Sequence, residues 1–184
     1  MQNPFLVGKK LYLRSLEKTD LEGDYLRWLN DPQVTEFMAS GSFPYSRERL
    51  EEYYKSMVAS NDNVLLAIID MKANKHIGNI RLGPIDWVNR VAPLGLMIGQ
   101  ASFWNRGYGA EVIRLSTGYA FTTLNMGKVK ANVIATNEGS LKAFRKAGFH
   151  EEGRAKNEFY RHGMYYDVVY LGITRDQFLS SKEG

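Results

Sequence analysis

Two glycines open the segment of the chain that is best suited to hold a phosphate group. Gly107 and Gly109 stand between a predicted strand and a long predicted helix. Glycine lets the backbone turn tightly and approach a ligand closely. The first turn of the helix adds unpaired N–H groups at the positive end of the helix dipole. This arrangement predicts a pyrophosphate site, although a Gly-x-Gly pair before a helix can also be turn chemistry alone.

Two familiar nucleotide-binding patterns do not fit this segment. A third glycine is missing, and no acidic residue on a following strand is placed for a ribose, which argues against a Rossmann dinucleotide site. No Gly-Lys-Ser or Gly-Lys-Thr follows, which argues against a P-loop. The glycines therefore predict a phosphate site of another kind.

A second segment with a regular spacing follows the next predicted strand. Its spaced residues are Asn137, Ser140, Phe144, Gly148 and Phe149. Together with Arg106-x-x-Gly109, this spacing resembles the two core motifs of the GNAT acetyltransferase superfamily. The later segment 152–168 resembles the RimJ/RimL branch, which often has a glutamate at the place of Glu111. The resemblance extends from about residue 8 to residue 178, nearly the whole chain.

The resemblance implies both a fold and a cosubstrate. The fold is α+β, with a mixed, mostly antiparallel, twisted sheet that is splayed at its centre and flanked by helices. The cosubstrate is acetyl-CoA, with its pyrophosphate on the backbone N–H groups of residues 106, 107, 109 and 110. Its pantetheine arm would lie between the strands 94–98 and 128–135. The implied cofactor-binding residues are Leu96, Met97, Ile98, Arg106, Gly107, Tyr108, Gly109, Ala110, Asn137, Ser140 and Phe144.

The same resemblance implies roles in catalysis. A backbone N–H near Met97 or Ile98 would stabilise the tetrahedral oxyanion, and Asn137 would hold the pantetheine. Ser140 would hydrogen-bond the sulfur and donate a proton to the departing thiolate. Many family members use a tyrosine for this step where this chain has Phe144. Phenylalanine cannot donate a proton, so the role falls to Ser140 or to water.

A general base is the least determined part of the predicted site. Glu158, and after it Glu36 and Asp31, are candidates because they lie on segments that would flank the acceptor. Ser140 and Glu158 are thus the predicted catalytic residues. Each candidate also has a simpler interpretation: Asn137 is a good helix N-cap, Ser140 could be a solvated hydroxyl, and carboxylates are usually solvated.

Composition narrows the class of protein. The 184 residues have an ordinary globular composition, and we expect one domain over residues 1–184. The chain has no cysteine, which removes disulfides, thiolate metal sites and a cysteine nucleophile, and is compatible with a reducing cytoplasm. His76, His150 and His162 lack metal-ligand spacing, so we expect no metal. We also expect neither a secretory leader nor a membrane span.

Charge bears on the partners. The net charge of +4 is mild and suits an anionic ligand such as a nucleotide. The charges are scattered and form no basic stripe, so we expect no nucleic-acid partner. The expected partner is a small-molecule or peptide amine, bound by a monomer or a homodimer.

Hydrophobic periodicity and helix-capping signals predict the order of the elements. The expected order is strand 10–16, helix 19–28 with a capping box at Thr19, short helix 32–37, helix 46–60, strands 64–71 and 76–82, strand 94–98, helix 107–124, strand 128–135, helix 138–147, strands 152–160 and 165–173, and a short terminal helix begun by the capping pair Thr174 and Gln177. One βαβ crossover, through helix 107–124, is expected near the middle.

The predicted reaction is direct attack of an amine on the bound thioester, since no cysteine or Ser-His-Asp arrangement indicates a covalent enzyme. Without a strong base the site favours a weakly basic amine, because α-amines have a pKa of about 7.7–8.0 against about 10.4 for lysine. The segment 27–38 resembles acetyltransferases that act on nucleotide-linked 4-amino sugars. We therefore place an amino sugar slightly ahead of a protein N-terminus. The rivals are a non-catalytic module that senses CoA or an amine, and a nucleic-acid-binding domain.

Overall fold

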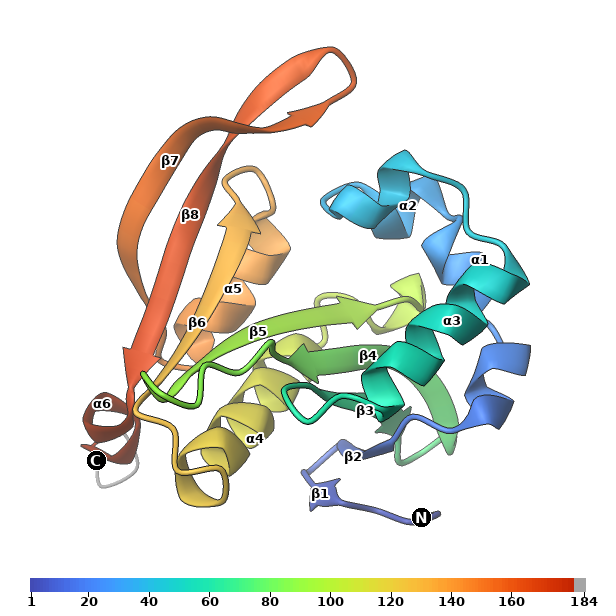
Figure 1. Cartoon of the computed structure of the whole chain (residues 1–184), viewed down its shortest axis with the longest axis horizontal. Helices are drawn as coiled ribbons and strands as arrows, with labels where there is room; N and C mark the ends of the chain where they lie inside the picture. The colour runs from blue at the N-terminus through green and yellow to red at the C-terminus, as the bar shows by residue number, and fades with distance from the viewer. Residues whose placement is uncertain (181–184) are drawn as a thin grey trace.

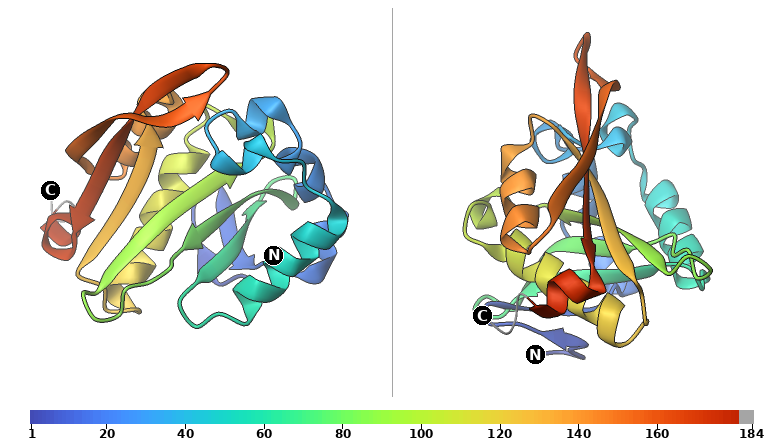
Figure 2. Two further views of the ribbon diagram at one scale, coloured as in Figure 1. Left: turned by 45° about the horizontal axis from the view of Figure 1, so that its top comes forward. Right: turned by 90° about the vertical axis from the view of Figure 1, so that its left-hand side faces the viewer.

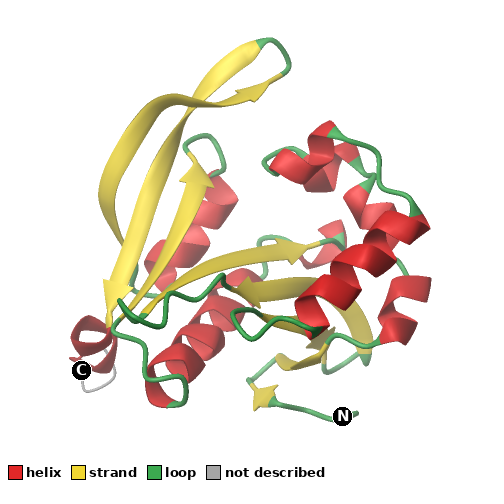
Figure 3. Cartoon of the chain, viewed as in Figure 1, coloured by secondary structure: helices red, strands yellow, loops and turns green. Residues whose placement is uncertain are grey.

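A computed structural model of the chain describes residues 1–180, and the last four residues of the expected domain lie outside the described part. Figures 1 and 3 show one sheet with helices on both faces. The strands are β1 (Leu6–Val7), β2 (Leu11–Ser15), β3 (Val64–Asp70), β4 (Lys75–Leu82), β5 (Val91–Ile98), β6 (Lys128–Ile134), β7 (His150–Arg161) and β8 (Met164–Thr174). The α-helices are α1 (Tyr25–Leu29), α2 (Pro32–Thr35), α3 (Arg47–Val58), α4 (Tyr108–Thr122), α5 (Glu138–Lys146) and α6 (Arg175–Ser180).

The sheet has eight strands in the order β1-β2-β3-β4-β5-β6-β8-β7. Every neighbouring pair is antiparallel except β5 and β6, which are parallel and are joined through α4. The α+β class, the mostly antiparallel sheet and the single crossover are therefore confirmed.

The alternation of side chains along the strands fills two hydrophobic clusters, one on each face of the sheet. Leu11 and Leu13 of β2 pack into a cluster with residues of α4, α5 and α6, whereas Tyr12 packs into a second cluster with residues of α1 and α3. Figure 2 shows these two sets of helices on opposite faces. The sheet is thus held from both sides, and its central strands can present ligand-binding groups at a fixed position.

The predicted helix 19–28 is wrong in its start and its continuity. The chain instead forms a 3-10 helix over Lys18–Glu22 and then the short helix α1. The cap lies two residues earlier than predicted, because the Asp20 carboxylate accepts the backbone N–H of Glu17 at 2.8 Å. Asp20 therefore acts as the distal member of the capping box, and Thr19 is not its first residue.

Two smaller differences concern strands. The short strand β1 was not predicted, and β5 begins at Val91, three residues before the predicted start. Pro93 lies inside β5 and cannot donate a hydrogen bond, but its carbonyl accepts the Gly83 N–H at 2.8 Å. The other predicted helices and strands agree with the structure to within two or three residues, and the predicted pair Thr174–Gln177 forms a capping box.

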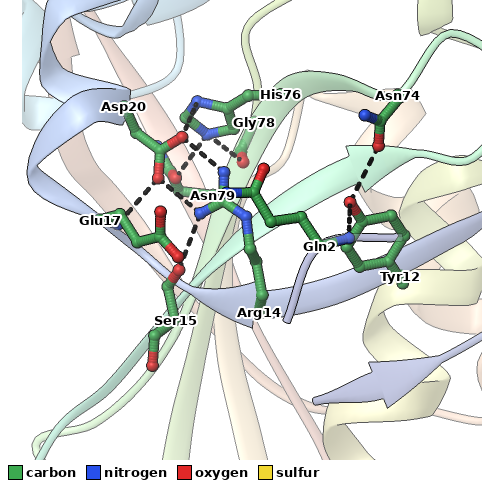
Figure 4. A network of polar contacts seen from close by, with 10 residues as sticks. All are labelled: Gln2, Tyr12, Arg14, Ser15, Glu17, Asp20, Asn74, His76, Gly78 and Asn79. Atoms are coloured by element: carbon green, nitrogen blue, oxygen red, sulfur yellow. Dashed lines mark hydrogen bonds and ion pairs between the residues drawn. The ribbon is translucent and has the colours of Figure 1, made fainter. Parts of the chain in front are cut away.

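A buried polar network connects β2, the first 3-10 helix and β4 (Figure 4). Arg14 donates two hydrogen bonds of 2.7 Å to the Asp20 carboxylate, and both side chains are less than a tenth exposed. His76 Nδ1 lies 3.7 Å from Asp20, and the His76 ring packs edge-on against Trp28. Burial alone would raise the pKa of Asp20, but its hydrogen bonds with Arg14 and the backbone lower it.

Candidate functional site

The predicted phosphate loop is braced against the turn between β1 and β2. Gly107 is the N-cap of α4 and has a left-handed backbone, with φ of +83°, which glycine adopts without strain. Lys10 Nζ donates to the carbonyl of Arg106 at 2.8 Å. In the opposite direction, the Glu111 carboxylate accepts the backbone N–H groups of Lys9 and Lys10. Glu111 therefore fixes the start of α4 to the turn between β1 and β2.

Gly109 stands where α4 meets α5. A β-carbon at this position would lie 3.3 Å from the Ala143 Cβ, so the glycine allows the two helices to approach closely. Beside it, the Tyr108 hydroxyl donates to the buried carboxylate of Asp70. Desolvation and this bond raise the pKa of Tyr108 to about 12. The hydroxyl of Tyr108 is thus a fixed structural donor.

The two central strands separate. β5 pairs with β6 only at Val91–Pro93, opposite Lys128–Lys130, and beyond this point the strands diverge (Figure 1). The splay that the family resemblance implied is therefore present. We call the space between residues 94–98 and residues 131–134 the seam. Backbone groups of β5 that face the seam have no strand partner there.

The ladder between β4 and β5 determines which amides face the seam. Gly99 N–H donates to the Ile77 carbonyl at 2.9 Å, so the odd-numbered residues of β5 turn their backbone groups toward β4. The Met97 amide accordingly faces β4, whereas the amides of Leu96 and Ile98 face the seam. Of the two predicted oxyanion donors, the N–H of Ile98 is the one that faces the seam.

The second motif surrounds the start of α5. The Asn137 side chain accepts the Ser140 N–H at 3.1 Å, so Asn137 is a helix N-cap, as its simpler interpretation held. The Ser140 hydroxyl is partly buried and makes no hydrogen bond with another residue of the described chain. Phe144 is only 3% exposed and packs edge-on against Phe149. Its side chain is therefore part of the hydrophobic core.

A cavity of about 260 Å³ opens at the carboxyl end of β6, next to the second motif. It is bounded by the two residues that follow α2, by the end of β6, and by the hairpin of β7 and β8, which leans over α2 (Figure 1). Its lining residues are Glu36, Phe37, Ile134, Thr136, Phe159, Arg161 and Tyr166. We call it the acceptor pocket. It combines three aromatic rings with one carboxylate and one guanidinium.

Arg161 joins the hairpin to the helical segment opposite. Its Nη2 donates to the carbonyls of Thr35 and Met38, at 2.8 and 2.6 Å. Next to it, His162 Nε2 lies 3.2 Å from the Glu36 carboxylate. These contacts hold the hairpin tip against α2 and close one side of the acceptor pocket.

The predicted bases lie in different surroundings. The Glu158 carboxylate is exposed and accepts the Tyr170 hydroxyl at 2.7 and 2.9 Å, and it does not line the acceptor pocket. This bond, and to a smaller extent desolvation, raise the pKa of Tyr170. Asp31 caps α2 by accepting the Gln33 N–H at 2.9 Å. Of the three candidates, only Glu36 lines the pocket.

Sequence alone did not single out Arg161, Phe159 or Tyr166 as pocket residues. Period-2 alternation places residues 159 and 161 on one face of a strand, but it does not tell which face a hairpin turns toward a distant helix. Within residues 1–180, no group of three or more histidine, aspartate or glutamate side chains is placed to hold a metal ion. No helix in this part of the chain is long and apolar enough to cross a membrane.

Comparison with known proteins agrees with this geometry. A family model, the acetyltransferase (GNAT) domain, matches residues 10–150. Spermidine N(1)-acetyltransferase of Vibrio cholerae is 28% identical over 180 residues, covering 96% of this chain and 100% of the relative. The Escherichia coli (strain K12) spermidine N(1)-acetyltransferase is 27% identical, covering 91% and 88%. The crystal structure of the Vibrio cholerae spermidine N-acetyltransferase with CoA and spermine has a TM-score of 0.84 at 27% identity, covering 94% of this chain and 99% of that chain.

Proposed function

The chain belongs to the GNAT acetyltransferase family, and on that premise we propose that it transfers an acetyl group from acetyl-CoA to the primary amine of a small acceptor. The amine attacks the thioester directly, in a ternary complex. One domain over residues 1–184, acting in the cytoplasm as a monomer or a homodimer, carries the reaction. No metal takes part.

One arrangement carries this proposal: the phosphate loop follows β5 and the acceptor pocket opens at the end of β6, and these are the two strands that border the seam. The loop at Gly107 lies at the start of α4, which follows β5, and the seam opens between β5 and β6. Ile134 and Thr136 line the pocket and directly precede Asn137. An extended donor lying on the loop amides and along the seam would place its reactive end at the pocket.

The residues then have distinct roles. The amides of residues 106, 107, 109 and 110 bind the pyrophosphate, with Tyr108 fixing the loop. The Ile98 N–H donates to the oxygen of the reacting carbonyl, where negative charge develops. As the new C–N bond forms and the C–S bond breaks, Ser140 or a water molecule protonates the thiolate. The amine proton leaves to water or to a carboxylate, for which Glu158 and Glu36 are the candidates.

For the acceptor we favour an amino sugar, in line with the weakly basic amine that the absence of a strong base requires. Phe37, Phe159 and Tyr166 give the pocket flat apolar surfaces of the kind that cover a sugar ring. Glu36 is the one carboxylate in the lining of the pocket. Arg161 would repel a second positive charge on an acceptor whose amine binds Glu36. A protein N-terminus, the acceptor type of the RimJ/RimL branch, has the same weakly basic amine and is the alternative peptide acceptor.

A polyamine is the second candidate, and the names of the relatives favour it. The similar proteins of Vibrio cholerae and Escherichia coli are spermidine acetyltransferases. Spermidine carries several positive charges at neutral pH, whereas the lining of the acceptor pocket contains one carboxylate, Glu36. A CoA-binding module without turnover would show neither preference.

The experiment is a panel of amines with acetyl-CoA at one fixed pH, with product amides identified by mass spectrometry. Glucosamine, a 4-amino sugar nucleotide, an N-terminal peptide, spermidine and free lysine are compared by kcat/KM. We expect one of the amino sugars to be acetylated much faster than spermidine or lysine. A preference for spermidine would replace the amino sugar with the polyamine, and absence of any amide product would leave a binding module.

A further inference from the structure

The acceptor pocket contains the guanidinium of Arg161, which forms no ion pair within 4 Å with an acidic residue in the described part of the chain. Its hydrogen bonds go to two neutral carbonyls, Thr35 and Met38, and its Nε is buried without any partner. A partly buried guanidinium without a counterion is costly, because charge is removed from water without compensation.

The position of this charge is fixed. The two carbonyl bonds hold one end of the guanidinium, and the ring of Phe159 lies beside it, 5.7 Å from Cζ to the ring centroid. The residue lines the acceptor pocket and also the neighbouring groove that contains Pro44. A guanidinium fixed on the wall of a pocket suits the recognition of carboxylate and phosphate groups, which arginine binds by charge-assisted hydrogen bonds.

The pocket is therefore bipolar. Glu36 supplies a negative charge that can hold an ammonium group before reaction. Arg161 supplies a positive charge in the lining of the same cavity. A polycation such as spermidine would gain from one and be repelled by the other. An acceptor that carries both an amine and an anionic group would gain from both.

We propose that Arg161 binds an anionic group, a phosphate or a carboxylate, on the amine acceptor, so that the enzyme selects anion-bearing amines over neutral or polycationic ones. This proposal rests on the proposed amine acetylation and specifies its substrate class. Arg161 is then a specificity-determining residue, in addition to its contacts with the backbone of residues 35–38.

Three amines with the same ring test the proposal: glucosamine, its 6-phosphate, and muramic acid, which adds a carboxylate. Calorimetry on the CoA-saturated protein measures their binding without requiring turnover. We expect at least one anionic amine to bind about tenfold or more tightly than glucosamine, the size expected of a charge-assisted hydrogen bond. Whichever of the two anionic amines binds more tightly identifies phosphate or carboxylate as the group that Arg161 recognises.

Variants separate recognition from structure. Arg161→Gln should remove the preference, so that the anionic amines bind no more tightly than glucosamine, and Arg161→Lys should retain part of it. Arg154→Gln is the matched control, because Arg154 lies on the same strand and pairs with Asp167 outside the pocket. Equal weakening of all three amines in Arg161→Gln would show a structural contact only and would overturn the proposal.

Two other results also overturn it: glucosamine or spermidine binding as tightly as both anionic amines, or no measurable binding of either anionic amine. Acetyl transfer is followed separately, with acetyl-CoA and the same amines. A binding preference without transfer would contradict the proposed acetylation and leave the role of Arg161 intact. Transfer with equal efficiency to neutral and anionic amines would support the proposed acetylation and contradict the role of Arg161.

Discussion

Glu111, in the first turn of α4, accepts the backbone N–H of Lys10 at 3.0 Å, while the Lys10 ammonium donates to the carbonyl of Arg106 at 2.8 Å. The phosphate loop and the turn between β1 and β2 thus hold each other in both directions. A loop that binds by its backbone amides must keep those amides in place before the ligand arrives. The brace supplies that order from residues about a hundred positions earlier in the chain.

This brace makes Glu111 important for CoA binding without contact with CoA. We expect Glu111→Ala to weaken CoA binding about tenfold, because the loop loses the contacts that fix it. Glu111→Gln should change the affinity far less, since the amide oxygen can still accept both N–H groups. Calorimetric titration with CoA measures both. Glu138→Gln, in the first turn of α5, is the control. If Glu111→Ala binds CoA as tightly as wild type does, the brace does not contribute to CoA binding.

Gly109 is expected to separate phosphate binding from helix packing. Gly109→Asp places a charge beside the pyrophosphate, and we expect it to abolish CoA binding while circular dichroism shows an intact fold. Gly109→Ala adds only a β-carbon 3.3 Å from the Ala143 Cβ, and should cost about 1 kcal/mol of stability or less. Undiminished CoA affinity in a folded Gly109→Asp protein would falsify the phosphate-site assignment.

Ser140→Ala should lower kcat more than it raises KM for acetyl-CoA, since the proton is needed mainly as the thiolate leaves. Loss of one acid typically costs about 10²–10⁴-fold. The substitution leaves the α5 cap intact, because Asn137 accepts the backbone N–H of residue 140. Steady-state kinetics decide the matter, and an unchanged kcat would assign the proton to water.

Phe144→Tyr in the Ser140→Ala background is the companion variant, and it should restore part of the lost kcat. Phe144 is only 3% exposed, so the added hydroxyl must find a partner or reach the seam. The single variant Phe144→Tyr is the control for stability. If it melts as wild type does and the double variant shows no recovery, a donor at position 144 cannot serve this site.

Local signals explain why most of the fold could be predicted. Gly107, Asn137 and Gly148 each mark a helix end by a property of the residue itself, and the structure has a left-handed backbone or a side-chain cap at each. The capping box predicted at Thr19 did not form, because the first turn begins at Glu17 and is capped by the Asp20 carboxylate, which also binds Arg14 on β2. Asp20 thus caps the turn and pairs with a distant strand at once, and the pairing with the strand cannot be read from the local sequence.

The acceptor pocket was harder to predict for the same reason. Glu36 was a candidate because its segment would flank the acceptor, but Arg161 reaches this segment only because the hairpin of β7 and β8 leans over α2. That approach depends on the twist and bulges of β7, which no short motif records. Glu158 illustrates the converse, since its strand was predicted correctly and its side chain nevertheless bonds to Tyr170 outside the pocket.

The buried network of Figure 4 predicts loss of stability in acid. Burial lowers the pKa of His76, against the smaller opposing effect of Asp20. Below the ordinary histidine pKa of about 6.5, the unfolded chain therefore binds a proton that the folded chain refuses. The unfolded state is then favoured as the pH falls. Asp20, whose pKa is also lowered, adds a second loss below its ordinary value of about 3.9.

We expect the melting temperature to fall between about pH 7 and pH 5 through His76, and more steeply at lower pH through Asp20. His76→Gln should flatten the upper part of this profile, because glutamine can still donate to the Gly78 carbonyl that His76 Nε2 contacts at 2.9 Å and has no proton to gain. His150→Gln is the matched control, since His150 is exposed and its replacement should leave the profile unchanged. Thermal melts of the three proteins across this range measure the effect. If wild type and His76→Gln lose stability in parallel down to pH 5, the buried histidine is not the source of the acid sensitivity.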